Sequence, residues 1–367
     1  MPPPAAAGPT ALEAARAPVE AVLRAYLAQA SARLAALDPA LADVATPAVE
    51  LALSGGKRLR PAFVHWGARA AGAALEGELG EAVHTAGAAV ELLHTFALVH
   101  DDVMDRAQWR RGRPALHRAM AEWHAAEGLV GDAGWFGIGA AILAGDIVFV
   151  WADELFDRAA AAVAEPAAAR EVFTRLRVEV MAGQYLDLRL AGLPRPTAEE
   201  ALRVALLKSG RYTVTRPLQL GAALGGAGSS RPGDALGSAL SAYGDALGVA
   251  FQLRDDVLGL YGDPAATGKE ALGDLREGKR TLLVLRALEL AGDRDRAAVA
   301  AALGDPALDH DGADRVRRIV RDTGALAAVE REMEQRLAEA VQALAAVPEP
   351  ARSALAELAR DSVHRLA

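Results

Sequence analysis

Two short acidic motifs, about 150 residues apart, contain the side chains best suited to bind a metal ion. The first, HDDVMD, places Asp101 and Asp105 four positions apart and therefore on one face of a helix. The second, FQLRDDVLGLYGD, contains Asp255 and Asp256. Carboxylates gathered in this way repel one another unless a cation lies between them, and oxygen ligands suit Mg²⁺, which often shares substrate phosphates. Either motif alone could be a solvated helix end, but together they predict two helix ends that face one cavity and hold Mg²⁺ around a polyanion.

Clusters of Lys and Arg accompany the acidic motifs, although the chain is acidic overall. A net charge of −8 argues against nucleic acid as the main partner, so each basic cluster is a local feature. The clusters are SGGKRLRP at 54–61, RRGRP at 110–114, Lys208-Ser209, Gly268-Lys269 and DLREGKRT at 274–281. Each cluster alone is most often a solvated surface feature. Around two acidic helices, however, Lys and Arg combined with carboxylate-bound Mg²⁺ form the kind of site that binds a diphosphate.

Long apolar helices are predicted to position these motifs. About a quarter of the 367 residues are alanine, the best helix former, and no strong strand pattern is found. Residues 83–99 and 241–263 are small or apolar on nearly every face, which is typical of buried helices. The absence of cysteine excludes disulfides, thiol catalysis and cysteine-bound metals. We therefore predict an all-α protein with one large domain at 18–367, preceded by a disordered Pro- and Ala-rich tail at 1–17.

The most apolar run, at residues 129–151, is predicted to be a buried core helix. Asp132 and Asp146 interrupt it, and the uninterrupted stretch is shorter than the about 20 residues that span a bilayer. The first residues contain no basic segment followed by a leucine-rich one, so no signal peptide is predicted. We expect a soluble, cytoplasmic protein with no stable membrane insertion.

In their order along the chain, these motifs resemble those of the trans-isoprenyl diphosphate synthases, or polyprenyl synthetases, and in particular bacterial geranylgeranyl diphosphate synthases. The motifs are GGKRLRP, ELLHTFALVHDDVMDRAQWRRGRP, KSG, FQLRDDVLG and GKEALGDLREGKRT. The resemblance extends from about residue 20 to 365. It implies long antiparallel helices around a deep central cavity, a homodimer, and head-to-tail condensation of isopentenyl diphosphate with an allylic diphosphate (dimethylallyl, geranyl or farnesyl).

The resemblance also implies a role for each residue that matches a family motif. The Mg²⁺ ions, three in each active site, are implied to bind Asp101, Asp105 and Asp255, with Asp102 in support. Isopentenyl diphosphate is implied to contact Lys57, Arg60, His94 and Arg111. The allylic diphosphate is implied to contact Arg110, Lys208, Gln252, Lys269 and Lys279. The residues implied in catalysis are Asp101, Asp102, Asp105, Asp255, Lys208 and Lys269.

One position departs from the family pattern. The second motif reads DDVLG, with Gly259 in place of the third Asp that is common in the family. The third acid is the one least needed for the metal, so the departure does not predict an inactive protein. It bears instead on the metal affinity of this motif.

The residues that precede the first motif predict the length of the product. In the family that the sequence resembles, a bulky residue five positions before the motif stops growth of the chain. Phe96 stands at that position, Ala97 follows it, and the motif contains no insertion. We therefore predict a chain-length floor at Phe96 and Ala97. The expected product is a medium-length all-trans prenyl diphosphate, geranylgeranyl diphosphate (C20) ahead of farnesyl diphosphate (C15) or a longer polyprenyl chain.

Two other functions are compatible with part of this pattern. A class I terpene cyclase shares Asp-rich motifs on an α-helical fold, but it needs no second diphosphate site such as GGKRLRP and RRGRP predict here. It also usually has an Asn, Ser and Glu triplet where this chain has FQLRDD. A catalytically silent subunit of a heteromeric synthase would have lost acids of the first motif or the pair Lys57 and Arg60, and all of these are present. The sequence therefore favours the synthase.

Overall fold

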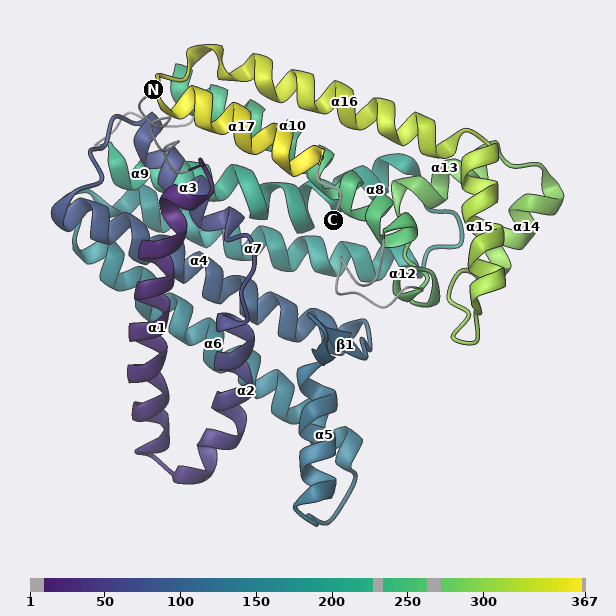
Figure 1. Cartoon of the computed structure of the whole chain (residues 1–367), viewed down its shortest axis with the longest axis horizontal. Helices are drawn as coiled ribbons and strands as arrows, with labels where there is room; N and C mark the ends of the chain where they lie inside the picture. The colour runs from purple at the N-terminus through teal and green to yellow at the C-terminus, as the bar shows by residue number, and fades with distance from the viewer. Residues whose placement is uncertain (1–9, 227–233, 263–271, 365–367) are drawn as a thin grey trace, which may run out of the picture.

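The computed structural model describes residues 10–226, 234–262 and 272–364, and helices form nearly all of the regular structure there (Figure 1). The first half of the chain forms α1 (Glu13–Ala35), η1 (Pro39–Leu41), α2 (Ala42–Leu53), α3 (Leu59–Ala70), α4 (Gly77–Met104), α5 (Leu116–Ala126), α6 (Ala133–Ala161) and α7 (Pro166–Ala191). The second half forms α8 (Ala198–Val204), η2 (Ala205–Thr215), α9 (Arg216–Gly225), α10 (Ala235–Tyr261), α12 (Gly273–Arg276), α13 (Leu282–Leu290), α14 (Asp293–Ala302), α15 (His310–Asp322), α16 (Ala325–Ala343), η3 (Leu344–Ala346) and α17 (Ala351–Val363). Within the described ranges the β structure is one antiparallel pair, β1 (Trp109–Arg110) and β2 (Arg113–Pro114). The all-α prediction is confirmed.

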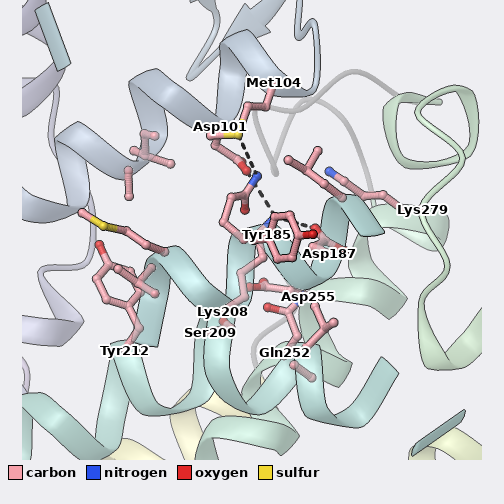
Figure 2. A pocket seen from close by; sticks show the side chains of 18 of the residues that line it. Asp101, Met104, Tyr185, Asp187, Lys208, Ser209, Tyr212, Gln252, Asp255 and Lys279 are labelled. Carbon is pink, nitrogen blue, oxygen red and sulfur yellow. Dashed lines mark hydrogen bonds and ion pairs between the residues drawn. The ribbon is translucent and has the colours of Figure 1, made fainter. Parts of the chain in front are cut away.

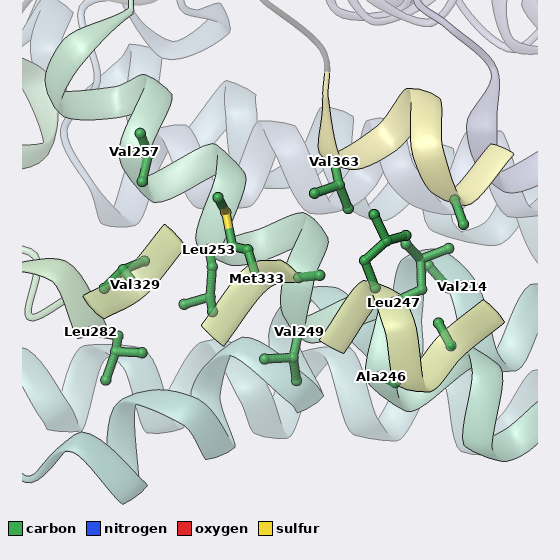
Figure 3. Close-up of a cluster of buried hydrophobic side chains, with 14 of the residues drawn as sticks. Val214, Ala246, Leu247, Val249, Leu253, Val257, Leu282, Val329, Met333 and Val363 are labelled. Atoms are coloured by element: carbon green, nitrogen blue, oxygen red, sulfur yellow. The ribbon is translucent and has the colours of Figure 1, made fainter. Parts of the chain in front are cut away.

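Two clusters of buried apolar side chains hold the helices together. One surrounds α4 and includes side chains of α1, α6 and α7. The other surrounds α10 and includes side chains of α13, α16 and α17, with Leu247, Leu253 and Met333 among them (Figure 3). Side chains of α3 and α9 contribute to both clusters. The acidic ends of α4 and α10 therefore lie on elements that belong to different parts of the core.

Glycines hold the π-helical segment η2 close to its neighbours. A Cβ atom at Gly183 of α7 would overlap the backbone of Lys208, and a Cβ atom at Gly248 of α10 would overlap Gly210. π-helical turns are rare and occur frequently at functional sites. Because α7 and α10 contact its backbone directly, η2 fixes the position of Lys208 between them.

The N-terminal helix begins earlier than the sequence predicted. α1 starts at Glu13, inside the segment 1–17 for which a disordered tail is expected, and Ala15 is fully buried. Residues 1–9 lie outside the described part of the chain. The predicted boundary after residue 17 is therefore wrong, because apolar side chains before it already pack against the body of the protein.

Two helices, α4 and α6, are long and apolar enough to cross a membrane when judged by length and composition alone. α4 is a core helix, since 72% of its most apolar window is buried. α6 departs from the predicted core helix at 129–151: only 28% of its window is buried, and Trp135, Leu143 and Val150 are exposed. One face of α6 packs on α4 and buries small residues such as Ala144. The prediction of a buried helix is wrong for the outer face of α6, because apolar composition alone does not tell whether other parts of the chain cover that face.

Candidate active site

A cavity of about 780 Å³ lies between α4 and α10, with α6, α7 and η2 contributing to its walls (Figure 2). Its polar part is lined by Asp101, by Lys279 and, on the opposite side, by Asp255. Its apolar part is lined by residues such as Phe96 and Val180. The fold thus brings two acidic helix ends, far apart in the sequence, to one cavity that also contains apolar surface.

The first acidic motif lies at the C-terminal end of α4, where the helix dipole disfavours negative charge. Cations offset this effect: the Lys208 ammonium lies 3.2 Å from Asp101 Oδ1, and Arg110 pairs with Asp102. Burial raises the pKa of Asp102 above its ordinary value. Burial acts on Asp101 in the same direction, but nearby cations, Lys208 foremost, outweigh it and lower the pKa of that carboxyl. Asp101 is therefore a partly buried but ionised carboxylate.

Lys208 reaches two carboxylates from η2. Its Nζ donates to Asp101 Oδ1 at 3.2 Å and to Asp187 Oδ2 on α7 at 2.7 Å. Burial lowers the pKa of Lys208, but Asp101 and Asp187 outweigh it and raise the pKa above the ordinary value. Asp187 was not among the residues predicted from the sequence. Its only signal there is a position three residues after Gln184, on the same face of a helix.

Lys279 holds the other acid of the first motif. Its Nζ lies 3.2 Å from Asp105 Oδ2, 2.6 Å from Glu277 Oε2 and 3.3 Å from Asp274 Oδ1. Burial raises the pKa of Asp105, and the charge of Asp101 raises it further. One ammonium group therefore connects the end of α4 with α12.

The second acidic motif lines the opposite wall of the cavity. Gln252, Asp255 and Asp256 all contribute to the lining near the end of α10, and Gln252 Nε2 donates to Asp256 Oδ1 at 2.7 Å. Figure 2 shows Asp255 and Gln252 on the side of the cavity opposite Asp101. Lys269, which the family resemblance assigns to the allylic diphosphate, lies outside the described residues.

A second group of polar side chains lines the same cavity. The Arg60 guanidinium stacks on the Tyr212 ring at 4.5 Å, and its Nη2 donates to Thr213 Oγ1 at 2.9 Å. The His94 ring lies 6.1 Å from that of Tyr212. Among the described residues, His94 Nδ1, Arg60 Nε and the Tyr212 hydroxyl are buried polar atoms without a hydrogen-bond partner. Buried polar groups are normally satisfied, so these three atoms indicate a place for a polar ligand.

The protonation states of this group follow from its burial. Burial lowers the pKa of His94 well below its ordinary value, and Arg60 and Arg111 lower it further. His94 is therefore a neutral imidazole. Burial raises the pKa of the Tyr212 hydroxyl above its ordinary range, so this group donates a hydrogen bond instead of acting as a base. Tyr212 was also not predicted from the sequence, in which it is a single aromatic residue after the KSG motif.

The remaining basic residues lie around the loop before α3. Arg111 has a left-handed backbone (φ 52°), and its Nη1 donates to Ser54 Oγ at 2.9 Å and to the Gly55 carbonyl at 3.0 Å. Lys57 is exposed in that loop. Arg111 therefore connects the β1–β2 hairpin to the glycine-rich loop, while neither it nor Lys57 belongs to the cavity lining as Arg60 and His94 do.

Aromatic side chains narrow the apolar part of the cavity. Phe96 is 8% exposed, and its ring lies 4.9 Å from the ring of Phe149 on α6 and 4.7 Å from that of His100. Ala97 lines the cavity beside it. Phe149 was not predicted from the sequence, because residues on α6 that face α4 cannot be distinguished there from those that face outward.

The carboxylates fit Mg²⁺ that is shared with a substrate. Among the described residues, no three Asp, Glu or His side chains converge closely enough to hold a metal ion by themselves. Mg²⁺ keeps several waters and is usually bound by one or two carboxylates together with substrate phosphates. Asp101 on one wall, with Asp105 one helical turn after it, and Asp255 on the other wall suit that arrangement, because Lys208 and Lys279 supply further positive charge for a phosphate.

Comparison with known proteins gives the family to which this fold belongs. Residues 42–321 match the sequence model of the polyprenyl synthetase family. The chain is 37% identical over 236 residues to a geranylgeranyl diphosphate synthase of Methanosarcina mazei, covering 64% of each chain. It is 33% identical over 309 residues to a geranylgeranyl diphosphate synthase of Mycobacterium tuberculosis, covering 83% of this chain and 79% of the other.

A solved structure extends the likeness to three dimensions. Geranylgeranyl pyrophosphate synthase from Corynebacterium glutamicum, complexed with isoprenyl diphosphate and magnesium, superposes with a TM-score of 0.87 at 35% identity, covering 95% of this chain and 97% of that one. The all-α architecture around the cavity is therefore the isoprenoid synthase fold. The chain belongs to the polyprenyl synthetase family, whose members are prenyltransferases.

Proposed function

We propose that this prenyltransferase condenses isopentenyl diphosphate head-to-tail with an allylic diphosphate (dimethylallyl, geranyl or farnesyl), and that its main product is geranylgeranyl diphosphate (C20). The observation that carries the proposal is the presence of two separate polar groups beside one apolar cavity. One consists of the acids at the ends of α4 and α10 with their lysines, and the other is the Arg60, His94 and Tyr212 group. Two diphosphates can therefore be held with their hydrocarbon parts in a common space. Relatives named geranylgeranyl diphosphate synthases support the product.

The acidic end of the cavity is assigned to the allylic diphosphate. Asp101, Asp105 and Asp255 are the residues that would hold Mg²⁺, three ions in all, with Asp102 keeping Arg110 in place. When bound, Mg²⁺ neutralises the leaving diphosphate and so eases cleavage of its C–O bond. Lys208 and Lys279 are proposed to contact phosphate oxygens, because each ammonium group lies beside a carboxylate of the first motif. Gln252 and Lys269 are further proposed contacts.

Isopentenyl diphosphate is assigned to the other polar group. The buried, unpartnered atoms of Arg60, His94 and Tyr212 can all donate to a diphosphate, since the neutral His94 can carry its proton on Nδ1. Lys57 and Arg111, from the loop and the hairpin, are proposed to close the site from the outer side. This arrangement keeps the two diphosphates apart while their carbon atoms meet.

The residues between the two diphosphates are proposed to protect the allylic cation. Apolar walls exclude water that would quench it. His94 is neutral and buried, and Tyr212 holds its proton firmly, so neither is a strong base. We assign the proton lost in the last step to the departing diphosphate. Phe96, Ala97 and Phe149 are proposed to limit the length of the chain that enters the apolar end.

A second copy of the chain is the proposed partner of the outer face of α6. Trp135, Leu143 and Val150 are exposed on α6, and Val178 is 61% exposed on the neighbouring α7. An exposed apolar patch of this kind is typical of protein–protein interfaces. We propose a cytoplasmic homodimer without stable membrane insertion or a nucleic-acid partner, in which α1 to α17 form one domain.

The function can be tested with purified protein, isopentenyl diphosphate, Mg²⁺ and each allylic diphosphate in turn. After phosphatase treatment, the expected product is the C20 alcohol geranylgeraniol. A C15 or longer alcohol would keep the reaction and correct the length. A cyclic hydrocarbon formed without isopentenyl diphosphate would instead identify a terpene cyclase, and no product with any primer would overturn the proposal.

A further inference from the structure

Gly259 stands one helical turn after Asp255 on α10, where the second acidic motif lacks its third carboxylate. A Cβ atom at this position would overlap Oδ2 of Asp274, a residue of α12. The carboxylate of Asp274 therefore packs directly against the backbone of Gly259. A side chain one turn after Asp255 would project from this same part of the helix.

Asp274 also lies in the polar part of the cavity. It lines the cavity together with Asp255 and Asp256, and its Oδ1 accepts a hydrogen bond from Lys279 Nζ at 3.3 Å. The same Nζ lies 3.2 Å from Asp105 Oδ2. Asp274 is thus placed beside the second motif and is connected through one ammonium group to the first.

The backbone around Asp274 is firmly held, so its carboxylate is positioned by the fold. The Asp274 carbonyl accepts from the Lys279 amide at 3.0 Å, which closes the turn between α12 and Lys279. Leu275 is buried, and its carbonyl accepts from the Gly304 amide at 2.8 Å. Arg276 donates through Nη2 to the Leu308 carbonyl at 2.7 Å.

We propose that Asp274 supplies the third carboxylate of the second metal motif, from α12 instead of α10, and that Gly259 is the residue that leaves room for it. This inference rests on the proposed function, because it assumes that Asp255 binds Mg²⁺ together with a diphosphate. The second motif then still has three acids, of which Asp255 and Asp256 come from α10 and Asp274 comes from α12. Restoring Asp at position 259 alone would damage the site, since its side chain would displace Asp274.

Binding of inorganic pyrophosphate as a function of Mg²⁺ concentration, measured by calorimetry, tests the proposal without turnover. D274N should raise the half-saturating Mg²⁺ concentration by about tenfold, as removal of a residue that supports a metal site typically does. G259A should give a similar shift, because its methyl group pushes the Asp274 carboxylate away. The double variant G259D/D274A should recover most of the lost affinity, since it moves the carboxylate back to α10.

Controls separate this inference from the proposed function. G292A adds a methyl group where nothing lies within 4 Å, and it should leave Mg²⁺ dependence unchanged. If wild type binds no pyrophosphate with Mg²⁺, or D101N binds as wild type does, the proposed function fails. If D101N loses binding while D274N and G259A behave as wild type, only the role of Asp274 is overturned. If D274N tightens pyrophosphate binding in the absence of Mg²⁺ and leaves the half-saturating Mg²⁺ concentration unchanged, Asp274 only neutralises Lys279, and that result would also overturn the proposal.

Discussion

At the scale of single residues, the polar part of the cavity is a set of carboxylates and ammonium groups that balance one another. Lys208 lies between Asp101 and Asp187, and Lys279 lies beside Asp105. Removing either lysine would leave partly buried carboxylates with fewer cations beside them, which is costly at the negative end of a helix. When Mg²⁺ and a diphosphate bind, the carboxylates would pair with Mg²⁺ and the ammonium groups with the diphosphate. The charges in the cavity would therefore be balanced both with and without the substrate.

Phe96 is expected to set the length of the product. F96A removes the ring that packs against Phe149 and His100, and it opens the apolar end of the cavity. The variant should make products longer than the wild type does, and F149A should shift them in the same direction. Chromatography of the dephosphorylated alcohols measures the result. An unchanged length distribution in F96A would mean that the floor lies elsewhere.

Tyr212 is expected to affect isopentenyl diphosphate and not the allylic substrate. Y212F keeps the ring that stacks on Arg60 but deletes a buried hydroxyl that has no partner within the protein. One lost hydrogen bond to a charged ligand corresponds to about 1.5–3 kcal/mol, or roughly a tenfold to hundredfold lower kcat/KM. Steady-state kinetics with each substrate varied in turn would measure it. Y261F, whose hydroxyl donates to the Arg317 carbonyl, is the matched control. Equal losses for both substrates would contradict the assignment.

At the scale of elements, the site depends on how neighbouring helices fit together. η2 can carry Lys208 into the cavity because glycines of α7 and α10 let its backbone approach them. α12 can present Asp274 to α10 because Gly259 has no side chain. Each of these contacts joins two different helical segments, and in each a glycine permits the contact.

The contact between α3 and α4 should make stability depend on pH. His65 Nδ1 lies 3.4 Å from His84 Nε2, and burial, with His84 and Arg69 nearby, lowers the pKa of His65 to about 4. In the unfolded chain the pKa of His65 has its ordinary value of about 6.5. Between pH 6.5 and 4, His65 is therefore protonated in the unfolded chain and neutral in the folded protein. Stability contributed by neutral His65 is therefore present above pH 6.5 and is lost as the pH falls.

The variant H65Q should reduce this dependence. Between pH 7 and 5, wild type should lose about 2 kcal/mol more of its free energy of unfolding than H65Q does. Urea denaturation at both pH values measures the difference. H310Q, at an exposed position, serves as the control and should keep the wild-type slope. A slope that is the same in H65Q and wild type would show that His65 takes up its proton without unfolding.

At the scale of the whole molecule, the apolar outer face of α6 lies close to the cavity. Phe149 and Asp146 of α6 line the cavity, while Leu143 and Val150 on the same helix are exposed. A partner that packs on the exposed face would therefore also stiffen one wall of the site. The proposed homodimer thus connects assembly with the apolar end of the cavity.

This connection predicts the effect of a charge on the α6 face. L143D places a carboxylate among the exposed apolar side chains and should convert a dimer into a monomer, as measured by sedimentation velocity. Because Leu143 is 61% exposed in the single chain, the monomer should remain folded, with unchanged circular dichroism. E199Q, at an exposed position on α8, is the control. A wild-type protein that sediments as a monomer would overturn the proposed interface.

The sequence by itself determined the helical fold, and it predicted many of the residues that line the candidate site. Alanine content and apolar periodicity predict helices, because these are local properties of the chain. The spacing of Asp101 and Asp105 places two carboxylates on one face without any knowledge of the fold. Motifs with several charged residues in a fixed order, such as GGKRLRP, likewise remain recognisable along the chain.

Only the tertiary structure decided which isolated residues join these motifs. Asp187, Tyr212 and Phe149 are single residues without a local pattern, and Asp274 begins the motif DLREGKRT without any local sign that it meets Gly259; all four reach the cavity through contacts between helices. The exposure of α6 and the start of α1 inside the expected tail were likewise decided by packing. The physical reason is the same in each case: which side chains a residue meets depends on surfaces that come from elsewhere in the chain. Spacing within one helix can therefore be read from the sequence, whereas the neighbour across a cavity cannot.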